Sequence, residues 1–268
     1  MLKQRVITAT ILAIVFLAAV FLLPAYAWAI LVVLLVGQGA LEWARLARMP
    51  AVTAVFYAVI SMLLLGSSIW WRAAEHLDLF WYGLSAGLWL TIVPGWLFAG
   101  WRFQNIPVLA LIGWAVLVPT GLAMVALHNA GPWWLLGIMS TVWLADIAAY
   151  FSGRRFGKHK LAPNISPGKT WEGAAGAVVL VSLYVLAIVW AAALGGTAPR
   201  WYFLLPAIWL WVALSIMGDL FESAVKRQAG VKDSGTLLPG HGGLLDRIDA
   251  LTSTLPFAAA WLLLEHGA

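Results

Sequence analysis

Long apolar stretches alternate with short polar segments along the whole chain, and this pattern predicts the fold. A helix needs roughly 20 mainly apolar residues to cross a bilayer. Backbone amides cannot stay unpaired in hydrocarbon, so each stretch is expected to be helical. We therefore predict an all-α, polytopic integral membrane protein with nine transmembrane helices, at residues 6–23, 26–43, 52–71, 79–99, 106–127, 133–152, 173–194, 201–221 and 250–265.

The composition supports a membrane protein without a separate soluble domain. Of the 268 residues, 63% are hydrophobic and 10% are charged, whereas soluble domains carry about 25% charged residues. We expect one membrane unit, with N-terminal helices at 1–130 and C-terminal helices bearing the polar cytoplasmic loops at 131–268. The first apolar stretch outlasts the core of a signal peptide, about 7–15 residues, and is expected to be retained. The absence of cysteine excludes disulfides and cysteine-type zinc sites.

The distribution of positive charge orients the predicted helices. Cytoplasmic loops of membrane proteins carry an excess of Lys and Arg. With the N-terminus inside, only Arg72 and Arg200 of the 16 Lys and Arg residues fall on the outer side. We therefore expect the N-terminus and the long polar loops in the cytoplasm of a cell whose inner membrane holds the protein. An odd number of spans then places the C-terminus outside.

The first long polar loop, 153–172, combines cations with glycines and prolines in "GRRFGKHKLAPNISPGKTWEG". An apolar helix is expected to start near Trp171. Ser166, Lys169 and Thr170 would then lie at a helix N-terminus, where free N–H groups and the helix dipole favour phosphate. The alternative is an ordinary basic cytoplasmic loop, which accounts for the cations but not for the order of residues 166–172.

The second polar loop, 222–249, sets acids beside cations and glycines. Helical spacings put acids and cations near one another at Asp219, Glu222, Ser223, Lys226 and Arg227. Gly240, Gly242 and Gly243 allow backbone N–H groups to approach an anion. Asp246 and Asp249 lie three residues apart and would share one helix face. Carboxylates facing Asp219 would form a hard oxygen site that suits Mg²⁺ with substrate phosphates. The alternative is a set of solvated loop charges.

Two acids within apolar stretches can also be explained without a metal site. Asp146 and Asp219 each lie near the cytoplasmic end of a predicted span, where an acid can hydrogen-bond between helices at modest cost. Glu42, at the end of the second span, is interpreted as the i,i+3 partner of Arg45.

The polar residues of the second loop resemble a family signature. Residues 223–249 closely match the signature of the phosphatidate cytidylyltransferase (CDP-diacylglycerol synthase) family, at Ser223, Lys226, Arg227, Lys232, Asp233, Pro239, Gly240, His241, Gly242, Gly243, Asp246, Arg247 and Asp249. Upstream, "ADIAAYFSGRRFGKHKLAPNISPGKTWEG" is similar to the other polar block of this family. The two blocks cover roughly the C-terminal half of the chain.

The resemblance implies that CTP and phosphatidic acid react on the cytoplasmic side to give CDP-diacylglycerol and pyrophosphate, with Mg²⁺. It also implies a homodimer in the lipid bilayer, a second, monovalent cation such as K⁺, and no nucleic-acid partner. The catalytic residues are expected to be Lys169, Asp219, Lys226, Arg227 and Asp246. The expected metal ligands are Asp219 and Asp246, with Asp249 and Asp146 behind them or at another cation. Substrate binding is assigned to Ser166, Thr170, Glu172, Ser223, Lys232, His241, Gly242, Gly243 and Arg247.

Three other classes of protein remain as alternatives. An ion- or proton-coupled transporter would use intramembrane acids as relays, but it predicts acids near the midplane and paired broken helices. A CDP-alcohol phosphotransferase would carry a D-G-x2-A-R-x8-G-x3-D-x3-D pattern, which this chain lacks. A membrane scaffold would not need a loop of acids and glycines.

Overall fold

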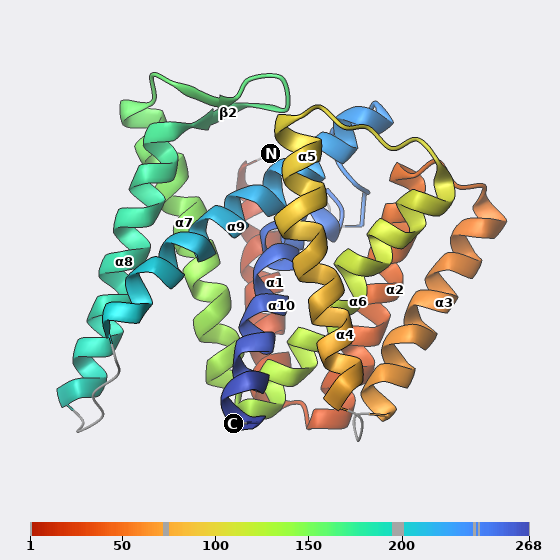
Figure 1. Cartoon of the computed structure of the whole chain (residues 1–268), viewed down its shortest axis with the longest axis horizontal. Helices are drawn as coiled ribbons and strands as arrows, with labels where there is room; N and C mark the ends of the chain where they lie inside the picture. Colours follow the sequence, from red (N-terminus) through yellow and green to blue (C-terminus); the bar gives the residue numbers. More distant parts are fainter. Residues whose placement is uncertain (1, 72–74, 195–200, 238–239, 241, 268) are drawn as a thin grey trace.

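The protein is a bundle of long helices with one small hairpin (Figure 1). The computed structural model describes residues 2–71, 75–194, 201–237, 240 and 242–267. Its elements, in chain order, are α1 (Leu2–Leu22), α2 (Ala25–Leu46), α3 (Ala51–Trp70), α4 (Glu75–Gly87), the π-helix η1 (Leu88–Ile92), α5 (Val93–Phe98), α6 (Ile106–Ala130), α7 (Pro132–Phe156), β1 (Lys160–Ala162), β2 (Ser166–Thr170), α8 (Trp171–Leu194), α9 (Trp201–Ala229) and α10 (Leu245–Gly267).

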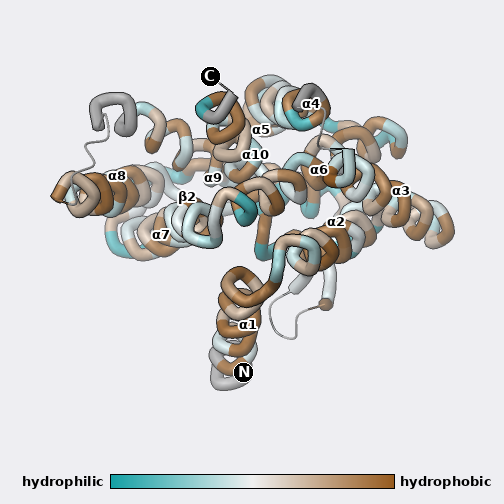
Figure 2. Tube along the Cα trace, turned by 90° about the horizontal axis from the view of Figure 1, so that it is seen from below, coloured by the Kyte–Doolittle hydropathy of each residue, from teal (hydrophilic) through white to brown (hydrophobic). Residues whose placement is uncertain are grey.

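The predicted class, a polytopic helical membrane protein, is confirmed. In the described part of the chain, eight helical stretches are long and apolar enough to cross a bilayer. One of them, Leu77–Phe98, runs through α4, η1 and α5 and corresponds to the predicted span 79–99. The first predicted span falls on α1, whose residues Ile7–Leu22 form a shorter apolar helix. Figure 2 shows α1 projecting away from the body formed by the other helices.

Helix α6 forms the centre of the bundle. Its apolar window is 78% buried, the highest share among the candidate spans. Side chains of α2 and α3 donate hydrogen bonds to its carbonyl groups, from Trp43 Nε1 to Leu109 O at 2.8 Å and from Tyr57 OH to Ala110 O at 3.0 Å. A Cβ at Gly113 would collide with both side chains. Hydrogen bonding across helices and a small residue at the contact thus bring these helices close together.

Helices α7 and α8 pair along one edge of the molecule, and α9 crosses obliquely from them toward α10 (Figure 1). Glycines allow the close approach of α7 and α8. A Cβ at Gly173 would lie 2.8 Å from Ala149 O, and one at Gly176 would collide with Ser152. The close pairing places the end of α7 and the start of α8 side by side, where the hairpin joins them.

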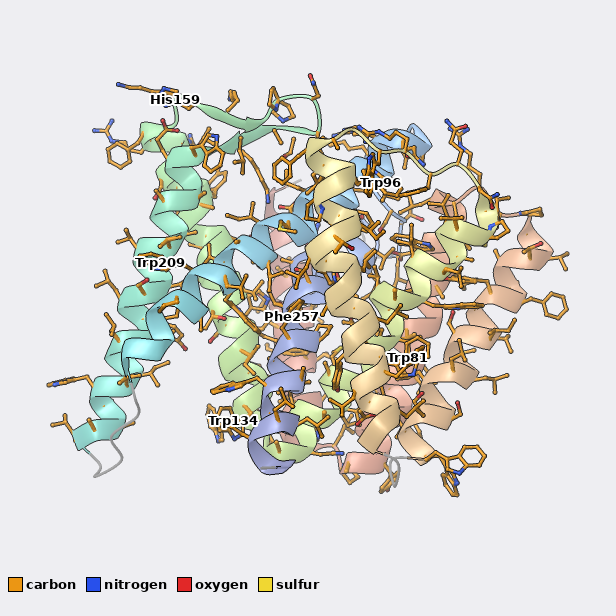
Figure 3. The ribbon with its side chains drawn as sticks, in the orientation of Figure 1. Trp81, Trp96, Trp134, His159, Trp209 and Phe257 are labelled. Carbon is orange, nitrogen blue, oxygen red and sulfur yellow. The ribbon has the colours of Figure 1, made fainter. Side chains whose placement is uncertain are left out.

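The segment before α8 is a small antiparallel hairpin and not a structureless loop. Strands β1 and β2 pair with Lys160 opposite Thr170 and Ala162 opposite Ser166. Figure 3 shows His159 beside this hairpin at one end of the molecule and Trp134 near the opposite end. The hairpin therefore covers the same end of the bundle as the polar ends of α7 and α8.

The second predicted loop, 222–249, is mostly helical at both ends. Helix α9 continues through Ala229, and α10 begins at Leu245. The linker between them is 230–244, shorter than predicted. Asp219, Lys226 and Arg227 thus lie on α9, and Asp246 and Asp249 lie in the first turns of α10. Rigid helices therefore carry most of the candidate site.

Candidate active site

A cavity of about 810 Å³ opens beneath the hairpin, and half of the predicted site residues line it. Helices α7, α8, α9 and α10 and the hairpin all contribute to its wall. Its charged and hydroxyl side chains are Asp146, Tyr150, Arg154, Lys160, Ser166, Lys169, Thr170, Asp219, Asp246, Arg247 and Asp249. The four predicted metal ligands, Asp146, Asp219, Asp246 and Asp249, thus line the same cavity. Residues about a hundred positions apart in the sequence meet there because the four helices and the hairpin come together at this end of the bundle.

The hairpin places Lys169 directly over α9. Lys169 Nζ lies 2.6 Å from Asp219 Oδ2, and the two side chains are 22% and 29% exposed. Ser223, one turn further along α9, donates a hydrogen bond to Asp219 Oδ1 at 3.3 Å. Lys169 of the first polar loop and Asp219, a predicted metal ligand, are therefore direct partners.

Lys226 bridges two buried carboxylates. Its ammonium lies 2.9 Å from Glu222 Oε2 and 2.6 Å from Asp246 Oδ1. The side chains of Lys226, Glu222 and Asp246 are 12%, 7% and 6% exposed. Glu222 was given no role in the predicted site, but the helical spacing that the sequence showed between it and Lys226 does bring the two side chains together on α9. The pairing ties α9 to α10 at the rim of the cavity.

Backbone amides hold the other oxygen of Asp246. Asp246 Oδ2 accepts hydrogen bonds from Gly243 N at 2.7 Å and Ser234 N at 2.9 Å. Ser234 Oγ lies 3.0 Å from the same oxygen. Gly242 has φ +83°, and a Cβ there would lie 2.6 Å from Asp246 Oδ2. The Gly243 amide, predicted to face substrate, is directed to Asp246 instead, and Gly242 is required by the turn itself.

Thr170 and Glu172 organise the junction between hairpin and helix. Thr170 is 5% exposed, and its hydroxyl accepts a hydrogen bond from Gly173 N at 3.1 Å, which caps α8. Glu172 accepts a bond from His159 N at 3.2 Å and contacts His159 Nδ1 at 2.6 Å. The predicted helix N-terminus beside Ser166 and Lys169 is therefore present, with Thr170 as its cap and Glu172 closing the hairpin.

The remaining predicted residues lie in different places. Ser166 and Arg247 line the cavity, and Ser223 reaches it through Asp219. Arg227 and Lys232 are exposed and are not part of the cavity wall. Arg227 Nη1 donates to Val231 O at 3.4 Å. His241 lies outside the described residues.

The predicted pairing of Glu42 with Arg45 is wrong. Glu42 is 0% exposed, while Arg45 is exposed to solvent. The Glu42 carboxylate accepts hydrogen bonds from Gln38, Ser234, Leu244 and Leu245. The carboxylate points into the bundle and reaches the 230–244 linker, a contact that local helix spacing could not reveal.

The carboxylates at the cavity wall are the candidate ligands for a cation. Within the residues that the structure describes, no three acidic or histidine side chains converge as a ready-made metal cluster. Mg²⁺ is commonly held by one or two carboxylates plus water and phosphate oxygens. The carboxylates of Asp219 and Asp246 at the cavity wall supply such hard oxygen donors.

Comparison with known proteins places the chain in a family. The model of the cytidylyltransferase family matches residues 3–264. A phosphatidate cytidylyltransferase of Pseudomonas aeruginosa is 39% identical over 280 residues, covering 98% of this chain and 97% of the relative. One from Haemophilus influenzae is 36% identical, covering 96% of this chain and 97% of the relative. One from Brucella suis is 52% identical over 134 residues, covering 49% of this chain and 45% of the relative. The chain belongs to the cytidylyltransferase family.

Proposed function

We propose that the protein is a phosphatidate cytidylyltransferase, which transfers CMP from CTP to phosphatidic acid and releases pyrophosphate. The observation that carries this proposal is the cavity that Lys169 and the four aspartates line together, with Lys226 paired to Asp246 at its rim. The two relatives that match over nearly their full length are named phosphatidate cytidylyltransferase, which supports the same substrates. The alternative of an ion- or proton-coupled transporter gains no support from the family, and the acids line one end of the bundle.

The proposed reaction requires anions to approach each other. A phosphate oxygen of phosphatidic acid attacks the α-phosphorus of CTP, the new P–O bond forms, and the bond to the pyrophosphate leaving group breaks. Both reactants are negatively charged, so their repulsion must be neutralised and their phosphates aligned. Lys169 and Arg247, at the cavity wall, would bind phosphate oxygens, and the capped N-terminus of α8 would favour an anion nearby. No covalent enzyme intermediate is needed.

The aspartates are proposed to hold the cation that accompanies CTP. Asp219 and Asp246 would be the principal protein ligands of Mg²⁺, with Asp249 and Asp146 behind them or at a monovalent cation such as K⁺. Bound Mg²⁺ supplies positive charge at the triphosphate. Asp219 and Asp246 each already face an ammonium group, from Lys169 and Lys226 respectively. The two carboxylates therefore already stabilise a positive charge in the structure, and binding a metal cation requires the same of them.

An apolar groove beside the polar cavity suits a lipid substrate. The groove has a volume of about 610 Å³ and lies among α5, the hairpin, α8 and α9, with Phe98, Trp171, Val178 and Trp209 in its wall. Leu161, Ala174 and Ile216 line both the groove and the cavity. A lipid could thus keep its acyl chains in apolar surroundings while its phosphate enters the polar cavity.

The location of the reaction follows from charge. The basic ends of α7 and α9 and the hairpin lie at one end of the bundle, and basic segments favour the cytoplasmic side. The active site would therefore face the cytoplasm from the bacterial inner membrane. The family resemblance supports a homodimer.

A direct assay tests the proposal. Purified protein in detergent is incubated with CTP, phosphatidic acid and Mg²⁺, and the lipid products are separated. CDP-diacylglycerol and pyrophosphate should appear in equal amounts and should depend on both substrates. Sealed vesicles containing the protein test the transporter: a flux of ions without lipid product would reverse the assignment.

A further inference from the structure

Glu42 is a buried acid far in sequence from the candidate site, yet it reaches the linker that shapes the site. It lies on α2, and its side chain is 0% exposed. Among the contacts of the described residues, its partners are neutral donors and not a lysine or arginine. Burying a carboxylate without such partners would be costly, so a full set of hydrogen bonds is expected.

Each oxygen of Glu42 accepts two hydrogen bonds. Oε1 accepts from Gln38 Nε2 at 3.1 Å and from Leu244 N at 2.9 Å. Oε2 accepts from Ser234 Oγ at 2.8 Å and from Leu245 N at 2.9 Å. Since α10 begins at Leu245, Glu42 satisfies N–H groups that the start of this helix leaves free. A carboxylate is also favoured there by the helix dipole.

Ser234 connects Glu42 to the active site. Its hydroxyl lies 2.8 Å from Glu42 Oε2 and 3.0 Å from Asp246 Oδ2. Its backbone N–H also donates to Asp246 Oδ2 at 2.9 Å. These contacts hold Oδ2, while Oδ1 is paired with Lys226. The single proton of the Ser234 hydroxyl can be donated to either carboxylate, so this serine links Glu42 to Asp246.

Two glycines make room for this arrangement. A Cβ at Gly243 would collide with both the Ser234 hydroxyl and the Glu42 carboxylate. A Cβ at Gly235 would come within 3.0 Å of Glu42. The glycines of the linker therefore allow the chain to close around the Glu42 carboxylate.

We infer that Glu42 is a positioning residue, whose buried carboxylate fixes the start of α10 and, through Ser234, the orientation of Asp246. It is not a catalytic residue, because it is absent from the wall of the cavity. This inference rests on the proposed function, in which Asp246 binds the cation that accompanies CTP. Groups that orient a metal ligand typically change metal affinity or activity by about 10–100-fold when they are replaced.

The test compares Glu42→Gln and Ser234→Ala with wild type. Glu42→Gln keeps the shape but turns two acceptors into one, and Ser234→Ala removes only the bridging hydroxyl. Glu265→Gln, an exposed acid near the other end of α10, serves as the control for loss of charge. For each, the melting temperature is recorded against Mg²⁺ alone, and kcat and KM for CTP are measured in parallel.

We expect Glu42→Gln to raise the Mg²⁺ concentration for half-maximal stabilisation by at least about tenfold, and to lower kcat by a similar factor. Ser234→Ala should shift the same midpoint in the same direction with little loss of the Mg²⁺-free melting temperature. Glu42→Asp, which keeps the charge, should recover part of the loss. Glu265→Gln should match wild type.

The inference would be overturned if the Mg²⁺ concentration for half-maximal stabilisation stayed within about twofold of wild type for both Glu42→Gln and Ser234→Ala. A wild-type protein that Mg²⁺ does not stabilise would also overturn it. If Glu42→Gln fails to fold, Ser234→Ala decides the question. The Mg²⁺ titration needs no turnover. A wild type that binds Mg²⁺ but makes no CDP-diacylglycerol would therefore refute the proposed function alone.

Discussion

Lys169 Nζ lies 2.6 Å from Asp219 Oδ2 and thereby joins the hairpin to α9. The pair joins a residue of the first polar loop to a residue at the end of the span that precedes the second loop, fifty positions later in the sequence. Both side chains are partly exposed to the cavity. A phosphate entering the cavity can therefore bind Lys169 in place of Asp219, and a cation can bind Asp219 in place of Lys169. Neither side chain is then left as a buried, unpaired charge.

Replacing Lys169 should impair the reaction but not the fold. Lys169→Ala removes a positive charge from the proposed triphosphate site. We expect kcat to fall by about 100-fold, which is typical when an enzyme loses one donor that stabilises negative charge in the transition state. The melting temperature should stay near wild type because the pair is partly exposed. Lys169→Arg, which keeps the charge, should retain more activity than Lys169→Ala. Equal activity of wild type and Lys169→Ala would show that this cation does not act on substrate.

Lys226 should behave differently, although the sequence predicts both lysines to be catalytic residues. Lys226→Met leaves Glu222 and Asp246 buried together without their shared cation. Removing one partner of a buried pair typically costs about 3–5 kcal/mol. Denaturation in detergent should reveal a clear loss of stability relative to Arg45→Ala, which removes an exposed cation of α2. If both variants unfold like wild type, the bridging role is refuted.

Thr170 should contribute chiefly as a helix cap. Thr170→Val keeps the shape but loses the bond from Gly173 N, and caps of this kind stabilise proteins by about 1 kcal/mol. Thr170→Ser keeps the hydroxyl and should preserve stability. Thermal unfolding of the two variants gives the comparison. A Thr170→Val protein that is as stable as Thr170→Ser, but inactive, would return Thr170 to the substrate site.

The aspartates should fall into two groups in a Mg²⁺ titration of CDP-diacylglycerol synthesis. Asp219→Asn and Asp246→Asn remove the proposed principal ligands, so extra Mg²⁺ should not restore their activity. Asp146→Asn and Asp249→Asn should weaken the site by about 10–100-fold and respond to added Mg²⁺. Near wild-type turnover of Asp219→Asn or Asp246→Asn at ordinary Mg²⁺ would place the cation on other carboxylates.

Much of the fold could be predicted because membrane thickness imposes a length on each apolar helix. The predicted span 79–99 corresponds to Leu77–Phe98 although π-helix η1 interrupts its α-helical pattern. The end of α9 at Ala229 was not predicted, because its last turns are polar and resemble a loop once the helix leaves the apolar layer. The strands of the hairpin are too short to produce a clear alternating pattern.

The residues of the candidate site could be predicted where a charged side chain stands beside an apolar span in the sequence. Lys169, Asp219 and Asp246 carry charge beside apolar spans, and the structure brings them to one cavity. Glu42 is an acid in a similar setting, but three of its four partners lie about 200 positions away, in the linker and at the start of α10. Such pairing depends on how α2 packs against α10, which hydropathy does not specify.

The most direct test follows the phosphorus atoms of CTP during the reaction with phosphatidic acid. CTP labelled at the α-phosphate is compared with CTP labelled at the γ-phosphate, using purified wild-type protein and Asp219→Asn. Transfer of CMP predicts that wild type places the α-label in a lipid product and the γ-label in pyrophosphate, while Asp219→Asn does neither at a comparable rate. A γ-label in the lipid, or no labelled lipid with either substrate, would contradict the account.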